Sequence, residues 1–396
     1  PRGAFGGRGC GMTGLNAENH MVGPRTGFEN EIGVLSDLRG NPTFRALYKP
    51  ADRTSIVRDI DLDFDASRIL FTSYRGFNNL FGIYEIKTDF SQLSSNLPYQ
   101  KATLVSPEEH KDIQWWDACY LPNKDQVVML GTAAYQFLPC EDGNMPMAVI
   151  YRKDRKTGEV RQLTYEQDSD YTPSVTHDGR ILYTRWEYSD LPHNFSRVLM
   201  TMNPDGVGQL SVWGTGSFFP TFMYSARVVP DDPHLITMMA GGHHDRAEVG
   251  RFLMIDPSLA RAYPFKYEAP SREWGPHHHV LRIPTQIFPK EKTGMVHEFP
   301  GWGKPVEGDV SDPLTQNQFA RGKPYFLHPY PLCENYHLAG VKAAPDALIG
   351  LYLVDRFDNI TRIAECEDGL YCEPIPFCAR KRPPVIPDRS KLGEKT

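Results

Sequence analysis

Short apolar runs separated by turn residues recur along the chain. Residues 56–74 hold one strand–turn–strand pattern, and the run at 81–89 adds a further strand. Patterns of the same kind occupy 115–132 with 147–164, 170–188 with 197–211, 218–242 with 250–261, and 325–341 with 349–364. Asp-Gly, Asn-Pro-Asp-Gly and Lys-Thr-Gly segments between the runs are typical of β-hairpin turns. No long apolar stripe with a period of 3.6 residues appears, which argues against a helical protein.

The repeats predict an all-β fold, a β-propeller. A single four-stranded sheet cannot bury both of its faces, whereas sheets arranged around an axis cover one another. The run at 30–48 is typical of outer strands only, and 372–388 is typical of an inner strand only. We therefore expect six blades, with seven as the alternative count, in a ring closed by strands from both chain ends.

The predicted propeller spans residues 30–388, and three segments lie outside its repeats. Residues 1–29 are Gly-rich and are expected to form an N-terminal arm. Residues 265–320 are expected to form a long loop insertion, a kind of segment that often carries function. Residues 389–396 are expected to be a tail leading to a further segment, because the chain has the features of a processed protein or a fragment.

Composition excludes two classes of partner. The net charge of −6 over 396 residues argues against nucleic acid, which requires a basic face, and the basic cluster at 379–384 is short. No run of 18 apolar residues exists, so no membrane-spanning helix is expected.

The cysteine spacing suggests a compartment. Cys366 and Cys372 flank a turn-like spacer and could form a disulfide, with Cys333 or Cys378 in a second one. Disulfides would indicate an oxidising, exported location such as the periplasm. The alternative is that these cysteines are isolated buried thiols.

Six segments in order carry a resemblance to a known family. They read DYTPSVTHDGRILYTRWEYSDLPHNFSR, MNPDGVGQ, AGGHHDRAEVGRFLMIDP, FLHPYPLCENYHL, GLYLVDRFDN and EPIPFCARKRPPVIPDR. Together they resemble the propeller region of the hydrazine synthase alpha subunit and its wider bacterial relatives, over about residues 30–388. The resemblance implies a periplasmic, haem-bearing protein in a multisubunit redox complex, with the propeller as scaffold and wall of the cofactor site.

The sequence departs from that family in one decisive respect. Covalent attachment of haem c needs Cys-x-x-Cys-His, and none of the seven cysteines lies in such a motif. We therefore expect no covalent haem on this chain, and contact with a haem c carried by another segment or chain. The rival hypothesis is a non-catalytic periplasmic binding propeller of the TolB-like type, since fold does not fix function.

Several residues are candidates for contacting the cofactor. The resemblance implies that a propeller cysteine touches the haem, which points to Cys140, although a disulfide or a plain buried thiol is the alternative. His243 and His244 follow two glycines and could contact haem or a metal, or could be structural. His193 follows the stretch from Arg185 to Tyr188, and we expect it to extend towards the same face of the propeller as that stretch.

Two other groups are candidates for metal binding. His277, His278 and His279 lie in the insertion and could bind a transition metal such as zinc, or could belong to a polar loop. Asp117, Asp168 and Asp170 lie near the start of inner strands. They could ring the axial channel and hold a cation such as calcium, or could cap turns.

The stretch from Arg185 to Tyr188 has two interpretations, a structural clamp or the rim of a site. Arg185 and Glu187 alternate with Trp186 and Tyr188, which places the charged and aromatic side chains on opposite sides of a strand. No hydrolase elbow, phosphate-binding loop, dinucleotide fingerprint or His-Glu-x-x-His motif is present. Hydrolase and nucleotide-enzyme functions therefore have no support from sequence motifs.

Overall fold

The computed structural model describes residues 2–3, 30–50, 56–74, 80–88, 101–108, 110–138, 146–187, 197–214, 222–241, 249–259, 295–298, 325–344, 347–366 and 369–390. Strands are the regular elements of this part of the chain, joined by one 3-10 turn at η4 (Pro257–Leu259). Within these ranges no helix has the length and apolar character needed to cross a bilayer.

Three four-stranded antiparallel sheets follow one another along the chain. The first sheet contains β4 (Arg58–Leu62), β5 (Arg68–Tyr74), β6 (Phe81–Lys87) and β7 (Thr103–Leu104). The second contains β8 (Trp115–Tyr120), β9 (Gln126–Gly131), β10 (Val149–Asp154) and β11 (Val160–Gln162). The third contains β12 (Asp170–Val175), β13 (Ile181–Trp186), β14 (Arg197–Met202) and β15 (Leu210–Trp213).

Two further units of four strands share one larger sheet, because β18 pairs with β20. The fourth unit contains β16 (Phe222–Val229), β17 (Asp232–Gly241), β18 (Val249–Ile255) and β19 (Met295–Glu298). The fifth contains β20 (Tyr325–Pro331), β21 (Tyr336–Lys342), β22 (Ile349–Asp355) and β23 (Ile360–Ala364). The five repeats expected from the hydrophobic pattern correspond to these five units.

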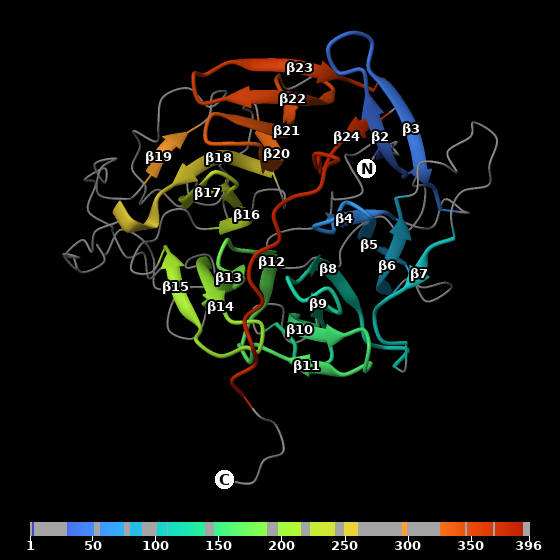
Figure 1. Cartoon of the computed structure of the whole chain (residues 1–396), viewed down its shortest axis with the longest axis vertical. Coiled ribbons are helices and arrows are strands. Elements are labelled where there is room, and N and C mark those ends of the chain that lie inside the picture. Colours follow the sequence, from blue (N-terminus) through green and yellow to red (C-terminus); the bar gives the residue numbers. More distant parts are fainter. Residues whose placement is uncertain are drawn as a thin grey trace, which may run out of the picture.

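The units stand around a common centre, which makes the fold a β-propeller (Figure 1). In each unit the first strand lies nearest the centre and the fourth lies at the periphery. The all-β propeller predicted from the repeats is confirmed. Buried residues of all five units, including Leu70, Val127, Tyr171, Met239 and Val341, form one hydrophobic cluster between neighbouring sheets.

Strands from both chain ends lie between the fifth unit and the first sheet (Figure 1). β2 (Ile32–Ser36) pairs with β3 (Thr43–Tyr48), and β1 (Arg2–Gly3) pairs with β24 (Leu370–Tyr371). These strands occupy the place where the sequence predicts a sixth blade. Since they form two separate two-stranded sheets, the count of six blades stays a prediction.

The expectation that 372–388 is itself an inner strand is wrong. Residues 372–390 follow the short strand β24 without regular structure. Five prolines in 372–388 explain this, because proline has no N–H to donate to a strand ladder. We call residues 372–390 the strap. It runs from the centre across one face of the molecule (Figure 1).

Polar contacts hold the strap to the first three sheets. The Arg380 N–H donates to the Phe64 carbonyl at 2.9 Å, and the Arg152 guanidinium binds both carboxylate oxygens of Asp388 at 2.6 and 2.7 Å. The Arg389 N–H donates to the Asp205 carboxylate at 2.6 Å. The strap therefore fastens the C-terminal region to sheets formed much earlier in the sequence.

The predicted segments outside the repeats are described only in small part. Arg2–Gly3 of the N-terminal arm forms β1, and residues 295–298 of the insertion form β19 at the edge of the fourth unit, so this piece is a strand and not a loop. Arg389 and Ser390 of the tail belong to the strap. The remainder of 1–29, 265–320 and 391–396 lies outside the described residues.

Candidate functional site: the axial pocket

A repeated backbone feature lines the centre of the propeller. One residue near the axis in each of the five units, together with one in the strap, has a left-handed backbone with φ between 43° and 53°. These residues are Asp59, Asp117, Thr172, Ser225, His328 and Glu373. We call them the axial ring. A β-branched residue such as Thr172 rarely adopts this conformation, so the geometry is imposed by the fold.

Bulges in the first strands produce the ring. In each of the five units the register between the first and second strand shifts at the left-handed residue. A β-bulge bends a strand and changes the direction of its side chains. The repeated bulge turns one polar side chain per unit towards the axis, where the alternation of an ordinary strand would not place it.

Hydrogen bonds connect neighbouring members of the ring. The Asp117 carboxylate accepts the Thr172 N–H at 2.9 Å, and the Thr172 hydroxyl accepts the Ser225 N–H at 3.0 Å. The Glu373 carboxylate accepts the Ile60 N–H of the first sheet at 2.7 Å. The ring thus joins adjacent sheets, and Glu373 links the strap to the first of them.

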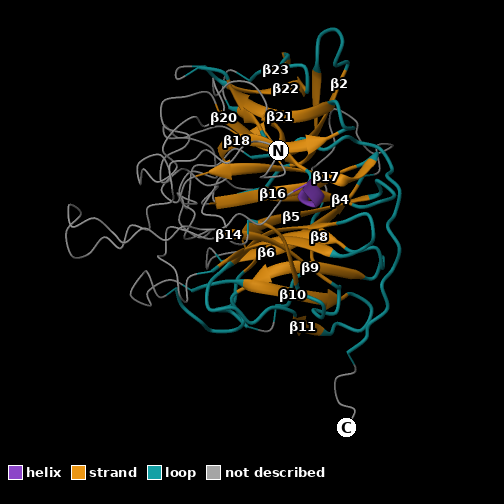
Figure 2. Ribbon diagram, turned by 90° about the vertical axis from the view of Figure 1, so that its left-hand side faces the viewer, coloured by secondary structure: helices purple, strands orange, loops and turns teal. Residues whose placement is uncertain are grey.

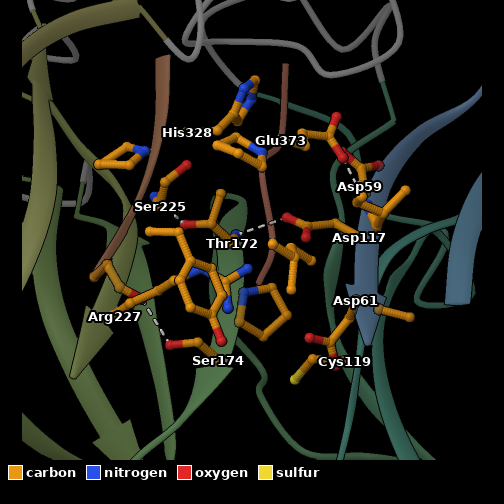
Figure 3. Close-up of a pocket in the computed structure, with 18 residues that line it drawn as sticks. Asp59, Asp61, Asp117, Cys119, Thr172, Ser174, Ser225, Arg227, His328 and Glu373 are labelled. Atoms are coloured by element: carbon orange, nitrogen blue, oxygen red, sulfur yellow. Dashed lines mark hydrogen bonds between the residues drawn. The ribbon is translucent and has the colours of Figure 1, made fainter. Parts of the chain in front are cut away.

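The ring lines a cavity of about 60 Å³, the axial pocket (Figure 3). A second layer of side chains, two positions further along each segment, completes its wall. This layer consists of Asp61, Cys119, Ser174, Arg227, Tyr330 and Ile375. The pocket is therefore built from equivalent positions in all five units and the strap.

The axial pocket adjoins a larger cavity of about 280 Å³ beneath the strap, which we call the vestibule. Both cavities are lined by Asp61, Cys119, Ser174, Arg227 and Tyr330. The strap covers the vestibule with Arg380, Lys381, Pro383 and Pro384. The two cavities share a wall, and we call them together the channel; strap residues line it on one face of the molecule.

Several of the carboxylates in this channel already have cationic partners. Asp59 pairs with the buried Arg58 at 2.7 Å. Asp61 pairs with Arg380 at 3.2 Å and accepts the Tyr120 N–H at 2.9 Å. Arg380 of the strap is therefore already paired with a carboxylate, so the basic cluster at 379–384 serves in part to hold the strap in place.

Cys119 lies in the shared wall but is not an activated thiol. Burial raises its pKa well above the ordinary value, and the carboxylates of Asp61 and Asp117 raise it further. The thiolate is the reactive form of cysteine, and it is disfavoured here. Cys119 therefore contributes a small neutral wall and not a nucleophile.

Of the three aspartates predicted to ring the channel, only Asp117 lines the axial pocket. Asp168 and Asp170 are fully buried in the third sheet and its preceding loop, where the Thr164 hydroxyl donates to Asp170 at 2.5 Å. Burial raises the pKa of Asp170 to about 8 and that of Asp168 to about 6. No group of three or more His, Cys, Asp or Glu side chains in the described residues is arranged to hold a metal ion.

The ion pairs of Arg185 and the ring contact of Trp186 lie within the third sheet and its preceding loop, so an inter-blade clamp stays a prediction. Arg185 pairs with Glu166 at 2.6 Å and with Glu187 at 3.7 Å. Trp186 is buried beneath the guanidinium of Arg197, which lies 4.0 Å from the ring centroid. These side chains fix the third sheet to its preceding loop and do not line the axial pocket.

The other predicted site residues lie outside the described residues. Cys140 falls between β9 and β10, His193 between β13 and β14, and His243 with His244 between β17 and β18. His277, His278 and His279 fall between β18 and β19. Their roles stay predictions.

The predicted disulfide is not formed. Cys366 and Cys372 are present as thiols, and so are Cys333 and Cys378. Cys366 is buried, in line with the alternative of buried thiols, and Cys378 is exposed. The spacing alone could not decide this, because a disulfide also requires the two Cβ atoms to face each other at close range.

Sequence reasoning missed most of the axial ring, including Thr172, Ser225, His328 and Glu373. One signal could have found it. If the repeats are aligned on their first turn, the left-handed residues of the ring fall in one column of the alignment, beginning with Asp59, Asp117 and Thr172. A second column, two positions later, contains Asp61, Cys119 and Ser174. Their differing chemistry hides this equivalence in a search for a shared residue type.

Comparisons with known proteins support the fold and not a family. No family model matches the sequence, and no curated protein matches it. Among solved structures, hydrazine synthase of Kuenenia stuttgartiensis is similar, with a TM-score of 0.58 and 13% identity over 91% of this chain. The match covers 44% of that chain, so the present chain spans less than half of its neighbour's length.

Two TolB structures resemble smaller parts of the chain. TolB from Acinetobacter baumannii has a TM-score of 0.36 and 13% identity over 57% of this chain and 49% of its own. A putative TolB from Agrobacterium tumefaciens has a TM-score of 0.41 and 12% identity over 58% of this chain and 72% of its own.

Proposed function

We propose that this chain is the propeller module of a periplasmic, multisubunit, haem-dependent redox assembly similar to hydrazine synthase. In this role it is a scaffold, and one of its faces forms a wall of the cofactor site. Two findings support the proposal. The first is the set of six ordered sequence motifs. The second is a fold shared over 91% of this chain with a hydrazine synthase chain, of which the match covers 44%.

The axial pocket does not fit a haem. Its volume of about 60 Å³ is far smaller than a porphyrin, and its polar ring residues are held by hydrogen bonds between sheets. The sequence also lacks Cys-x-x-Cys-His. We therefore propose that the haem, which would supply the electron-transfer chemistry, is carried by another segment or chain.

The observation that carries the proposal is the equivalent position of three candidate segments. Cys140, His193 and the His243–His244 pair each fall between the second and third strand of consecutive units. In a propeller, equivalent strands of successive blades end on the same face. We propose that these segments present a thiol and imidazoles on one face, since these groups contact iron and other transition metals well.

The test is an absorption spectrum, reduced minus oxidised, of the assembly purified through this chain from its native source. The proposal predicts a c-type haem band, with metal analysis showing iron, while mass spectrometry of this chain shows no haem adduct. The His243→Ala and Cys140→Ser variants should shift that band, whereas His234→Ala, at an exposed position near the start of β17, should leave it unchanged.

Two results would contradict the proposal. A preparation with partners but without haem would favour the non-catalytic binding propeller. Stoichiometric zinc or copper in place of iron would move attention to His277, His278 and His279. A haem-shifted mass on this chain would overturn the prediction that the haem comes from elsewhere.

A further inference from the structure

The guanidinium of Arg227 lies in the channel without a carboxylate partner among the described residues. It lines both the axial pocket and the vestibule, and its recorded contact is with the ring of Tyr330, whose centroid lies 5.0 Å away. An arginine stacked on an aromatic face keeps the edges of its planar fork available for two parallel hydrogen bonds to a carboxylate. Lys381 adds a second positive charge to the vestibule wall.

The other end of the channel is acidic. Glu373 is about nine-tenths buried, and its carboxylate accepts only the neutral Ile60 N–H within the described part of the chain. Asp117 adds a second carboxylate to the same layer. Figure 3 shows Glu373 and Arg227 towards opposite ends of the axial pocket.

The channel is therefore polarised along its length. Asp59 and Asp61 are paired with Arg58 and Arg380, so they add little net charge. What remains is the carboxylate of Glu373 in the first layer and the guanidinium of Arg227 in the second. A lone anion would be repelled by the first layer, and a lone cation by the second. A molecule with one charge of each sign gains from both, because each charge meets its opposite in a partly buried site where screening is weak.

We infer that the axial channel binds a small zwitterion, with its ammonium group at the Glu373 layer and its carboxylate at Arg227. The narrow axial pocket limits the ligand to a few heavy atoms, and the strap roofs the end that holds the carboxylate. This site is distinct from the haem-facing surface proposed above and does not depend on it, since its residues come from the first strands and the strap.

The inference is tested by calorimetric titration of the full chain with glycine, β-alanine and γ-aminobutyrate, and with acetate and methylammonium as singly charged halves. We expect at least one zwitterion to bind at least about tenfold more tightly than either half. Arg227→Gln and Glu373→Gln should each weaken that binding by at least about tenfold. Glu373→Gln keeps an amide oxygen that can accept the Ile60 N–H, so the strap stays attached.

Arg382→Gln is the matched control. Arg382 belongs to the strap and pairs with the exposed Asp65 at 2.7 Å, but it lines neither cavity, so its loss removes the same charge without changing the affinity. If Arg227→Gln does not fold, Arg227→Lys replaces it in the titration. Lysine keeps the positive charge but lacks the planar fork, so this variant should also bind the zwitterion more weakly than the wild type. The inference is overturned if no zwitterion binds, if a singly charged half binds as tightly, or if the Arg227 and Glu373 variants bind like the wild type.

Discussion

Asp117 and Asp170 show how a single residue's role depends on the bulge in its strand. Both are aspartates near the start of a first strand, and both were candidates for the axial channel. Asp117 lies at the bulge and reaches the pocket, whereas Asp170 lies two residues before Thr172, the left-handed residue of its own unit. Residue type and approximate position were readable from the sequence, but the bulge that selects the axial residue was not.

Burial of Asp170 predicts an unusual dependence of stability on pH. Its pKa rises from the ordinary value of 3.8 to about 8, because burial disfavours the charged form. The native state then keeps a proton that the unfolded state has lost. The contribution of Asp170 is therefore fully present below its ordinary pKa and is lost as pH rises towards 8, at a slope on the order of 1 kcal/mol per pH unit.

Asp170→Asn should remove that slope, because the amide cannot ionise while its oxygen can still accept the Thr164 hydroxyl. Urea unfolding at pH 5, 6, 7 and 8 measures the slope. We expect the free energy of unfolding of the variant, relative to that of the wild type, to increase with each step in pH. Asp154→Asn is a control without such a slope, because backbone N–H donors lower the pKa of Asp154 and its carboxylate is ionised in both states over this pH range. Parallel curves for the wild type and Asp170→Asn would show that Asp170 is ionised in the folded protein.

At the scale of elements, periodicity predicted the strands well and their ends less well. The alternation of apolar residues and the Asp-Gly turns located the five units, because these signals are local. The strap was mistaken for a strand because its apolar residues are spaced like one. Its five prolines have no N–H to donate to a strand ladder, and it is held by contacts such as that of Arg152 with Asp388, which are distant in sequence.

The contact between the strap and the third sheet can be tested at Gly179. This glycine has φ +87° in the turn after β12, and an added Cβ would collide with the Pro384 carbonyl oxygen. Gly158 has φ +80° in another turn and open space around it. Both alanine variants impose backbone strain of about 1 kcal/mol, but only Gly179→Ala also displaces the strap.

We expect Gly179→Ala to lower the free energy of unfolding by about 1 kcal/mol more than Gly158→Ala. Limited proteolysis should cut the strap faster in Gly179→Ala alone. Equal losses of stability and equal cleavage in the two variants would mean that the strap does not rest on this turn.

At the scale of the whole molecule, the contact that closes the axial pocket joins distant parts of the chain. β2, β3 and β24 lie between the fifth unit and the first sheet, and Glu373 reaches from the strap to Ile60 of β4. Figure 2 shows the course of the C-terminal region along one side of the stacked sheets. The sequence predicted that the two ends would meet, because each had only part of a blade, but the residues that join them are 313 positions apart and share no local signal.

The axial pocket depends on that closure, because Glu373 belongs to its wall. The most direct measurement is the hydrogen-exchange rate of the Ile60 amide in the wild type and in Glu373→Ala. Ile60 lies within the bulge of β4, outside the strand ladder, so its protection depends on the Glu373 carboxylate. We predict slow exchange in the wild type and much faster exchange in Glu373→Ala, with the amides of β13 unchanged. An Ile60 amide that exchanges equally fast in both proteins would contradict the closed axial site.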